Sequence, residues 1–206
     1  MQEDDAGEFG RHSTFLADRN TRYRAVPTAA GLAFLISLDV TVTLLRTLAV
    51  GIPRYPEPLV ADLVVSGSAL KICNVHLSLE SGERAHAIAN LLSHGSPLPD
   101  VICGDFNEES DQGVLANIAA AGFDDVGREI GPTMPAESPA VRLDHILLNQ
   151  RSALELTGIA LAGSLPDVSG AYASDHLGLL ATAVLPRIAF QDHREAAHLN
   201  QVGPTR

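Results

Sequence analysis

The chain of 206 residues has no tryptophan and only two cysteines, and aromatic residues make up just 4% of it. Cys73 and Cys103 are too few for the disulfide framework of a small secreted domain, and both lie in apolar runs typical of buried strands. We therefore expect a reducing compartment and a cytoplasmic location.

Basic residues are scarce as well. Lys and Arg number 14 against 25 Asp and Glu, which gives a formal net charge of −11. A surface of this sign repels polyanions, which argues against a protein that coats nucleic acid through a broad basic face. A metal-dependent enzyme could still act on a phosphate ester, because a bound cation supplies positive charge locally.

Long apolar runs are also missing. The nearest candidate for a membrane span, residues 25–52, is interrupted by Asp39 and Arg46. Its charge-free part falls short of the roughly 18 to 20 residues that a spanning helix requires. Residues 1–5 are acidic and lack the basic and then apolar order of a secretory signal. We expect neither a transmembrane segment nor a secretory signal.

Apolar residues are plentiful by contrast, at 46% of the chain, which can build a packed core. Apolar, β-branched runs separated by Gly, Pro and Ser predict strands, and two stretches with helical spacing predict helices between them. We expect an α/β or α+β domain with mixed sheets over residues 1–186 and a polar tail over residues 187–206. The predicted strands are 31–38, 40–50, 59–66, 69–77, 100–104, 141–149, 155–162 and 177–185, the predicted helices are 82–93 and 112–121, and residues 4–30 are predicted to form at most a short helix or loop.

Acids and histidines gather where apolar strands end and side chains leave the core. Each such segment has an ordinary structural interpretation as a turn, a helix cap or a core histidine. Asp144 is harder to explain in that way, because a carboxylate inside an apolar strand costs several kcal/mol unless it is paired or metal-bound. The segments are Gln2-Glu3, Asn74-Val75-His76-Leu77, Gly104-Asp105-Phe106-Asn107, Arg142-Leu143-Asp144-His145-Ile146 and Ser174-Asp175-His176.

Taken together and in this order, the segments resemble the signatures of the endonuclease/exonuclease/phosphatase superfamily, whose members share the metal-dependent fold of deoxyribonuclease I. The resemblance covers residues 2 to about 185. It implies a four-layer α/β sandwich of two mixed β-sheets packed face to face and flanked by helices, with the site at one edge. The family usually carries one more strand before its Gln-Glu motif, so we expect the first strand to be missing here.

The resemblance also implies a metal site. Phosphoester hydrolysis needs a hard cation to neutralise developing charge, and Mg²⁺ prefers one or two carboxylates plus waters. By resemblance, Glu3 is the direct ligand of Mg²⁺ or Mn²⁺, with Asp175 and Asp105 close enough to assist. Asp105 and Asn107 are expected to hold the attacking water or the phosphate.

Three further roles follow from the resemblance. His176 is expected to bind or polarise the phosphoryl group, and Asp144 to accept a hydrogen bond from His176 and fix its tautomer. His76 is expected to donate to a phosphate oxygen or to the leaving group. His145, the neighbour of Asp144, falls on the opposite face of the same strand, and we assign it to packing.

These observations predict a metal-dependent hydrolase of phosphodiesters or phosphomonoesters that acts by in-line attack of water. Two alternatives remain: a catalytically impaired or truncated remnant of the same fold, and an endonuclease acting on DNA. A DNA-binding module without catalysis is opposed by the acidic charge, which favours a small phosphorylated substrate or a lipid head group over nucleic acid. Loops choose the substrate in such folds, so the sequence predicts no particular substrate and no partner protein.

Overall fold

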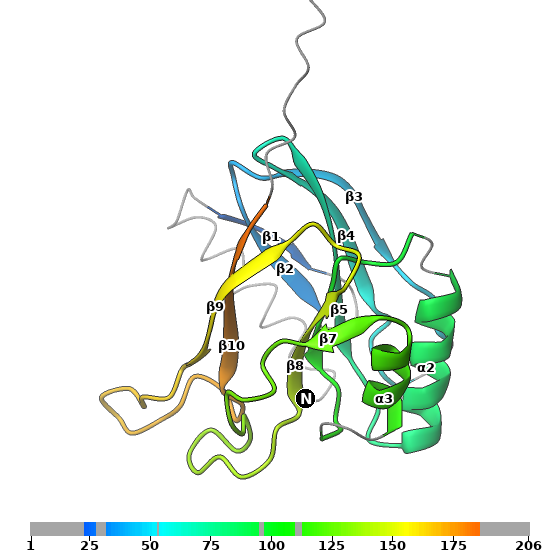
Figure 1. Cartoon of the computed structure of the whole chain (residues 1–206). Helices are drawn as coiled ribbons and strands as arrows, with labels where there is room; N and C mark the ends of the chain where they lie inside the picture. The colour runs from blue at the N-terminus through cyan, green and yellow to red at the C-terminus, as the bar shows by residue number, and fades with distance from the viewer. Residues whose placement is uncertain (1–22, 28–31, 53, 95–96, 110–112, 186–206) are drawn as a thin grey trace, which may run out of the picture.

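The computed structural model describes residues 23–27, 32–52, 54–94, 97–109 and 113–185. Among the described elements, five strands precede the first helix, one strand separates it from the second, and four strands follow (Figure 1). The described elements are β1 (Tyr23–Pro27), β2 (Ala33–Ser37), β3 (Thr41–Thr47), β4 (Leu59–Val65), β5 (Ser68–His76), α2 (Ser81–His94), β6 (Val101–Asp105), α3 (Gly113–Ala120), β7 (Phe123–Asp125), β8 (Asp144–Asn149), β9 (Glu155–Ala162) and β10 (Gly178–Val184).

Six strands form a mixed sheet in the order β3-β4-β5-β6-β8-β7. Neighbouring strands are antiparallel except β5 and β6, which run parallel because α2 crosses over between them. The pairs β1–β2 and β9–β10 form two smaller antiparallel sheets. Figure 1 shows α2 and α3 on one side of the six-stranded sheet and the two smaller pairs on the other. The predicted mixed α/β fold class is therefore confirmed.

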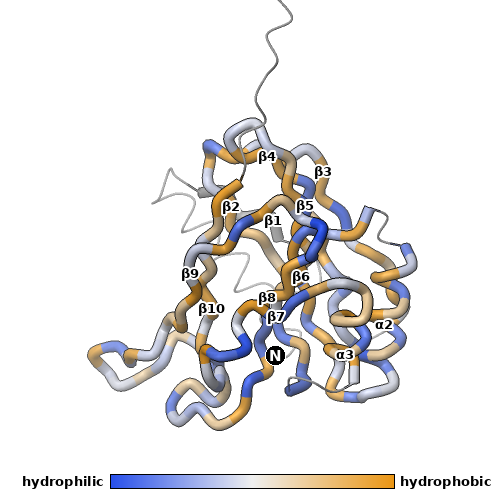
Figure 2. Tube along the Cα trace, in the orientation of Figure 1, coloured by the Kyte–Doolittle hydropathy of each residue, from blue (hydrophilic) through white to orange (hydrophobic). Residues whose placement is uncertain are grey.

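The main core lies between the helices and the six-stranded sheet. Ile88 and Leu91 of α2 are buried against Cys73 and Val75 of β5 and Ile102 of β6. Because side chains alternate along a strand, the residues between these buried ones point to the other face of the sheet. Figure 2 shows apolar residues gathered along the strands, whereas α2 carries both apolar and hydrophilic residues.

The cysteines do not bond to each other, and both are free. They lie on neighbouring strands but at successive rungs, Cys73 opposite Ile102 and Cys103 opposite Asn74, so they occupy opposite faces of the sheet. Burial raises the pKa of both thiols, that of Cys103 to about 11, which keeps them protonated and unreactive. No helix in the described part of the chain is long and apolar enough to cross a membrane.

Three local predictions are wrong. Residues 4–30 include the five-residue strand β1, which pairs with β2, so this part of the segment is neither helix nor loop. The three-residue β7 was not predicted, because so short a segment carries no periodic pattern. The strand predicted over 141–149 begins only at Asp144, since Val141 forms an isolated bridge with Met134 instead. The predicted tail, residues 187–206, lies outside the described residues.

A buried ion cluster joins β7 to β8 on the helix side of the sheet. Arg142 donates from Nη2 to Asp125 Oδ1, and His145 lies 2.9 Å from Asp125 Oδ2 through Nδ1. The other ring nitrogen of His145 is 2.9 Å from the carbonyl oxygen of Glu108. Polar contacts on both ring nitrogens therefore hold the imidazole between the Asp125 carboxylate and the Glu108 carbonyl. His145 is 1% exposed and lies edge-on against Phe106, which agrees with the predicted packing role, but its polar contacts with Asp125 and Glu108 were not predicted.

This cluster predicts a loss of stability in acid. Burial alone would raise the pKa of Asp125, but the hydrogen bonds from His145 and Arg142 outweigh it and hold the pKa below its usual value. The stabilisation is then complete above the unfolded-state pKa of about 3.9 and is lost as the pH falls through the lower folded-state pKa. We expect Asp125→Asn to reduce the free energy of unfolding at pH 7 by about 3 kcal/mol.

Urea unfolding at pH 7 and at pH 3 measures this effect. The wild type should lose stability between the two pH values, and Asp125→Asn should lose less of it. Asp124→Asn is the matched control, because the Asp124 carboxylate is exposed and, within the described residues, its hydrogen bond is to the Gln150 side chain. An equal loss in the wild type and in Asp125→Asn would contradict the assignment.

Candidate active site

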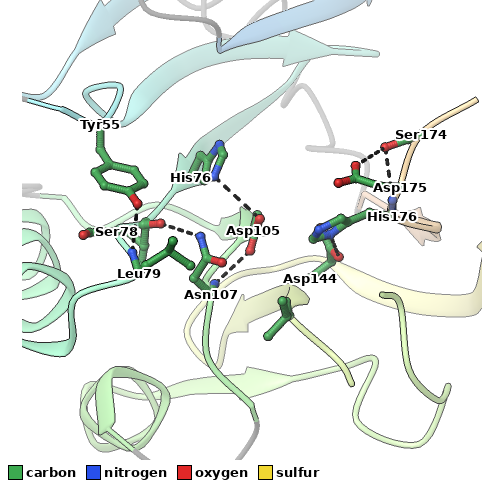
Figure 3. A network of polar contacts seen from close by, with 12 residues as sticks. Tyr55, His76, Ser78, Leu79, Asp105, Asn107, Asp144, Ser174, Asp175 and His176 are labelled. Carbon is green, nitrogen blue, oxygen red and sulfur yellow. Dashed lines mark hydrogen bonds and ion pairs between the residues drawn. The ribbon is translucent and has the colours of Figure 1, made fainter. Parts of the chain in front are cut away.

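Three polar side chains form a row across the edge of the six-stranded sheet. The parallel strands β5 and β6 both end at this edge, and the antiparallel β8 begins there. His76 pairs with Asp105, and Asp105 pairs with Asp144. Directly opposed residues share a face, so the three side chains project together from the face away from the helices. Figure 3 shows His76 directed toward Asp105, with Asp144 on the following strand.

The glycine before Asp105 allows this close packing. Gly104 has a φ of 133°, and a Cβ built on it would lie 2.0 Å from the carbonyl oxygen of Val75. Any side chain there would push β6 away from β5 and separate Asp105 from His76. The Gly-Asp-Phe-Asn segment therefore needs its glycine for a steric reason.

His176 joins the row from the loop before β10. Its Nδ1 donates to Asp144 Oδ2 over 2.8 Å, and both side chains are about one-fifth exposed, at 21% and 20%. Burial alone would lower the pKa of His176, but the hydrogen bond to Asp144 and the charges of Asp144, Asp105 and Asp175 raise it above its usual value. The ring is therefore fixed in orientation, and its charged form is favoured.

Asp105 lies at the centre of the site. Its Oδ2 is 3.7 Å from His76 Nε2, and its Oδ1 accepts a 2.8 Å hydrogen bond from the backbone N–H of Asn107. Burial raises the pKa of Asp105, and the nearby charge of Asp144 raises it further. The hydrogen bond from the Asn107 N–H and the charges of His76 and His176 lower it, but the net effect is a rise. Asp105 is thus a carboxylate whose charge the surrounding protein does not fully compensate.

Asn107 follows Asp105 in a tight turn. Its φ of 48° is in the left-handed region, which asparagine tolerates better than most residues. Its Nδ2 donates to the carbonyl oxygen of Leu77 over 2.7 Å, which ties the end of β6 to the end of β5. The side-chain amide is held beside Asp105 by this contact.

The structure thus brings together His76, Asp105, Asn107, Asp144 and His176. Asp175 lies next to them but is exposed; its carboxylate accepts a hydrogen bond from the Ser174 hydroxyl over 3.3 Å. Glu3 lies outside the described residues.

A divalent cation suits the chemistry of this site in part. Mg²⁺ binds hard oxygen ligands and commonly uses only one or two carboxylates with waters. Asp105 offers a half-buried carboxylate whose raised pKa shows that a further positive charge nearby would stabilise it. The described residues contain no group of three or more His, Cys, Asp or Glu side chains placed to hold a metal. Asp105 is therefore a fitting ligand but an insufficient one without further donors.

Two side chains at the site were not predicted from the sequence. The Tyr55 ring stands edge-on to His76, with ring centres 5.9 Å apart, and its hydroxyl accepts a hydrogen bond from the Leu79 N–H. The fully buried Thr133 accepts hydrogen bonds from the backbone at the start of β8. Both come from irregular loops, and neither the composition nor the spacing of those loops marks them.

Two packed layers of sheet lie under a helical layer, which makes the described fold an α/β sandwich with acids and histidines at one end of its main sheet. The chain belongs to the endonuclease/exonuclease/phosphatase family, whose model matches residues 1–176. The predicted family resemblance is thereby confirmed. A search of curated protein sequences finds no significant match.

Solved structures agree on the fold. A humanized TDP2 from D. rerio aligns with a TM-score of 0.69 at 21% identity and covers 83% of this chain and 80% of its own. A family member from Bacteroides thetaiotaomicron aligns with a TM-score of 0.69 at 14% identity, and the alignment covers 86% of this chain and 80% of that one. The human nocturnin catalytic domain aligns with a TM-score of 0.68 at 18% identity, and the alignment covers 88% of this chain and 78% of that one. At these identities the likeness shows the fold alone.

Proposed function

We propose that this protein is a Mg²⁺- or Mn²⁺-dependent hydrolase of phosphoesters that cleaves by in-line attack of water. Membership of the family supports a phosphoesterase or nuclease type of activity. The observation that carries the finer proposal is the row of His76, Asp105 and Asp144 across three strands, completed by the 2.8 Å hydrogen bond from His176. Residues a hundred positions apart converge there on one patch of surface.

The charges of these residues fit a phosphate ester. His176, with Nδ1 committed to Asp144, presents Nε2–H as a donor to a phosphoryl oxygen, and its raised pKa favours the charged donor. His76 offers a second donor, to a phosphoryl oxygen or to the departing oxygen. Together they place hydrogen-bond donors where negative charge develops in the transition state.

Asp105 and Asn107 orient the attacking water, and Asp105 accepts its proton. The half-buried Asp105 carboxylate is held by the backbone N–H of Asn107, so it is placed to accept a proton from the water, and the Asn107 amide is fixed beside it. The water oxygen bonds to phosphorus as its proton passes to Asp105, the bond to the leaving oxygen breaks, and that oxygen takes up a proton from His76 or from solvent water. Glu3, with Asp175 and Asp105 assisting, would hold the divalent cation, which when bound supplies charge neutralisation at the phosphoryl group.

Removing the metal should abolish this activity. We expect hydrolysis of bis(p-nitrophenyl) phosphate or p-nitrophenyl phosphate to stop when EDTA is added and to return with excess Mg²⁺ or Mn²⁺. Mg²⁺ should also raise the thermal unfolding midpoint, because a ligand that binds only the folded state stabilises it. Hydrolysis that continues at the same rate in EDTA would contradict metal dependence. A folded protein that turns over neither ester would favour the alternative of an impaired remnant.

We favour a small phosphorylated substrate or a lipid head group over nucleic acid, because the net charge of −11 repels a polyanion. DNA remains the alternative, and a solved structure of D. rerio TDP2 in this fold is complexed with a single-strand DNA product. Plasmid cleavage that falls steeply with salt would support a nuclease. The proposed cytoplasmic location depends only on the small number of cysteines and their free state.

A further inference from the structure

One buried residue links the two members of the Asp144–His176 pair. The hydroxyl oxygen of Thr133 accepts hydrogen bonds from the backbone N–H groups of Leu143, over 3.2 Å, and of Asp144, over 3.3 Å. The carbonyl oxygen of Thr133 accepts a 2.7 Å hydrogen bond from the backbone N–H of Leu177, the residue after His176. Thr133 is 0% exposed, so none of these contacts competes with solvent.

The loop around Thr133 runs along the segment that carries His176. Ala136, three residues on, donates from its backbone N–H to the carbonyl oxygen of Asp175 over 2.7 Å. The backbone of Thr133 is itself fixed to Val141 by a 2.8 Å hydrogen bond. The loop is therefore attached to the chain on both sides of His176 and to the start of β8.

We propose that Thr133 is a positioning residue for the proposed phosphoester hydrolysis, and that its hydroxyl sets the position of Asp144 relative to His176. This inference rests on the proposed function. β8 begins at Asp144, where the regular ladder starts and the backbone depends on side-chain acceptors. Without the hydroxyl, two partly buried N–H groups lose their acceptor, and the backbone at the start of the strand must shift to find others. The carboxylate of Asp144 would move with it, and so would the imidazole that it orients.

Thr133→Val and Thr133→Ser separate the hydroxyl from the volume of the side chain. Valine keeps the shape but removes the acceptor, whereas serine keeps the acceptor. We expect Thr133→Val to lower kcat for bis(p-nitrophenyl) phosphate by about 10- to 100-fold with a much smaller change in KM, because misplacement of a catalytic group acts mainly on the transition state. Thr133→Ser should stay within about threefold of the wild type.

Ser152→Ala is the matched control for lost stability. The Ser152 hydroxyl likewise bonds to partly buried groups, donating to Asp100 over 2.7 Å and accepting from the Leu154 N–H over 3.3 Å, but at the far end of the sheet. All variants are assayed well below their unfolding midpoints. Ser152→Ala should keep the wild-type kcat. A kcat for Thr133→Val equal to that of Ser152→Ala would overturn the proposal.

A second readout does not depend on activity. The imidazole Nδ1–H of His176, which donates to Asp144, gives a resonance in ¹H–¹⁵N spectra of the folded protein that His176→Ala removes. Thr133→Val should shift or broaden this resonance, and Thr133→Ser and Ser152→Ala should leave it in place. If the wild type hydrolyses no phosphoester, the proposed function fails, but the spectra still test the positioning role. An unchanged resonance in Thr133→Val would refute that role by itself.

Discussion

We expect His176→Ala to lower kcat for phosphoester hydrolysis by about a thousandfold, the loss typical of removing a charged donor to the developing oxyanion. The effect should be larger on kcat than on KM, because the hydrogen bond strengthens as charge builds on the phosphoryl oxygens. Stopped or steady-state assays with bis(p-nitrophenyl) phosphate and Mg²⁺ measure both constants. The fold should survive, since the ring is partly exposed and its one described side-chain partner is Asp144.

His94→Ala provides the comparison for this variant. His94 is an exposed histidine in the last turn of α2, where it contacts Ser93 and the carbonyl oxygen of Asn90. It should retain the wild-type kcat. If His176→Ala and His94→Ala turn over at the same rate, then His176 does not act in catalysis.

Asp105→Asn should cause a loss of comparable size, about 10²- to 10⁴-fold in kcat, because it removes the proposed proton acceptor and a metal ligand together. Asparagine preserves the size of the side chain and can still accept the hydrogen bond from the Asn107 N–H. The stability of the metal-free protein should not fall with the activity. Burial raises the pKa of Asp105, so the charged carboxylate is disfavoured in the fold, and the neutral amide should leave the metal-free unfolding midpoint unchanged or higher.

Thermal unfolding in EDTA beside the kinetic assay tests both parts of this prediction. Asp124→Asn removes an exposed carboxylate on β7 and should change neither quantity. A variant Asp105→Asn that loses activity because it unfolds would show a lowered midpoint, which would contradict the view that Asp105 serves catalysis at a cost to stability.

The sequence was sufficient for the part of the site that depends on strand geometry. Period-2 alternation placed His76 near the end of one strand, and an apolar run placed Asp105 just after another. Asp144 was predicted inside a strand over 141–149, whereas it is the first residue of β8. Such patterns are local, so the sequence alone reveals them. The pairing of Asp105 with Asp144 is different, because register between strands 40 residues apart is set by the whole sheet.

Contacts made by irregular loops could not be predicted. Thr133 lies in a Gly- and Pro-rich loop with no periodicity, and only the folded chain shows that its hydroxyl meets the Asp144 backbone. Tyr55 reaches His76 from another such loop. The strand β1 was missed for a related reason: its residues are stabilised by pairing with β2, and tertiary partners override local preference.

The most direct test of the account is a double-mutant cycle between His176→Ala and Asp105→Asn, with kcat measured for the wild type, both single variants and the double variant. Residues that act on one reacting phosphate form a unit, so the double variant should lose at most about tenfold more than the worse single variant. If the kcat loss of the double variant equals the product of the two single losses, the two side chains work independently. Four equal kcat values would mean that the edge of this sheet is not an active site.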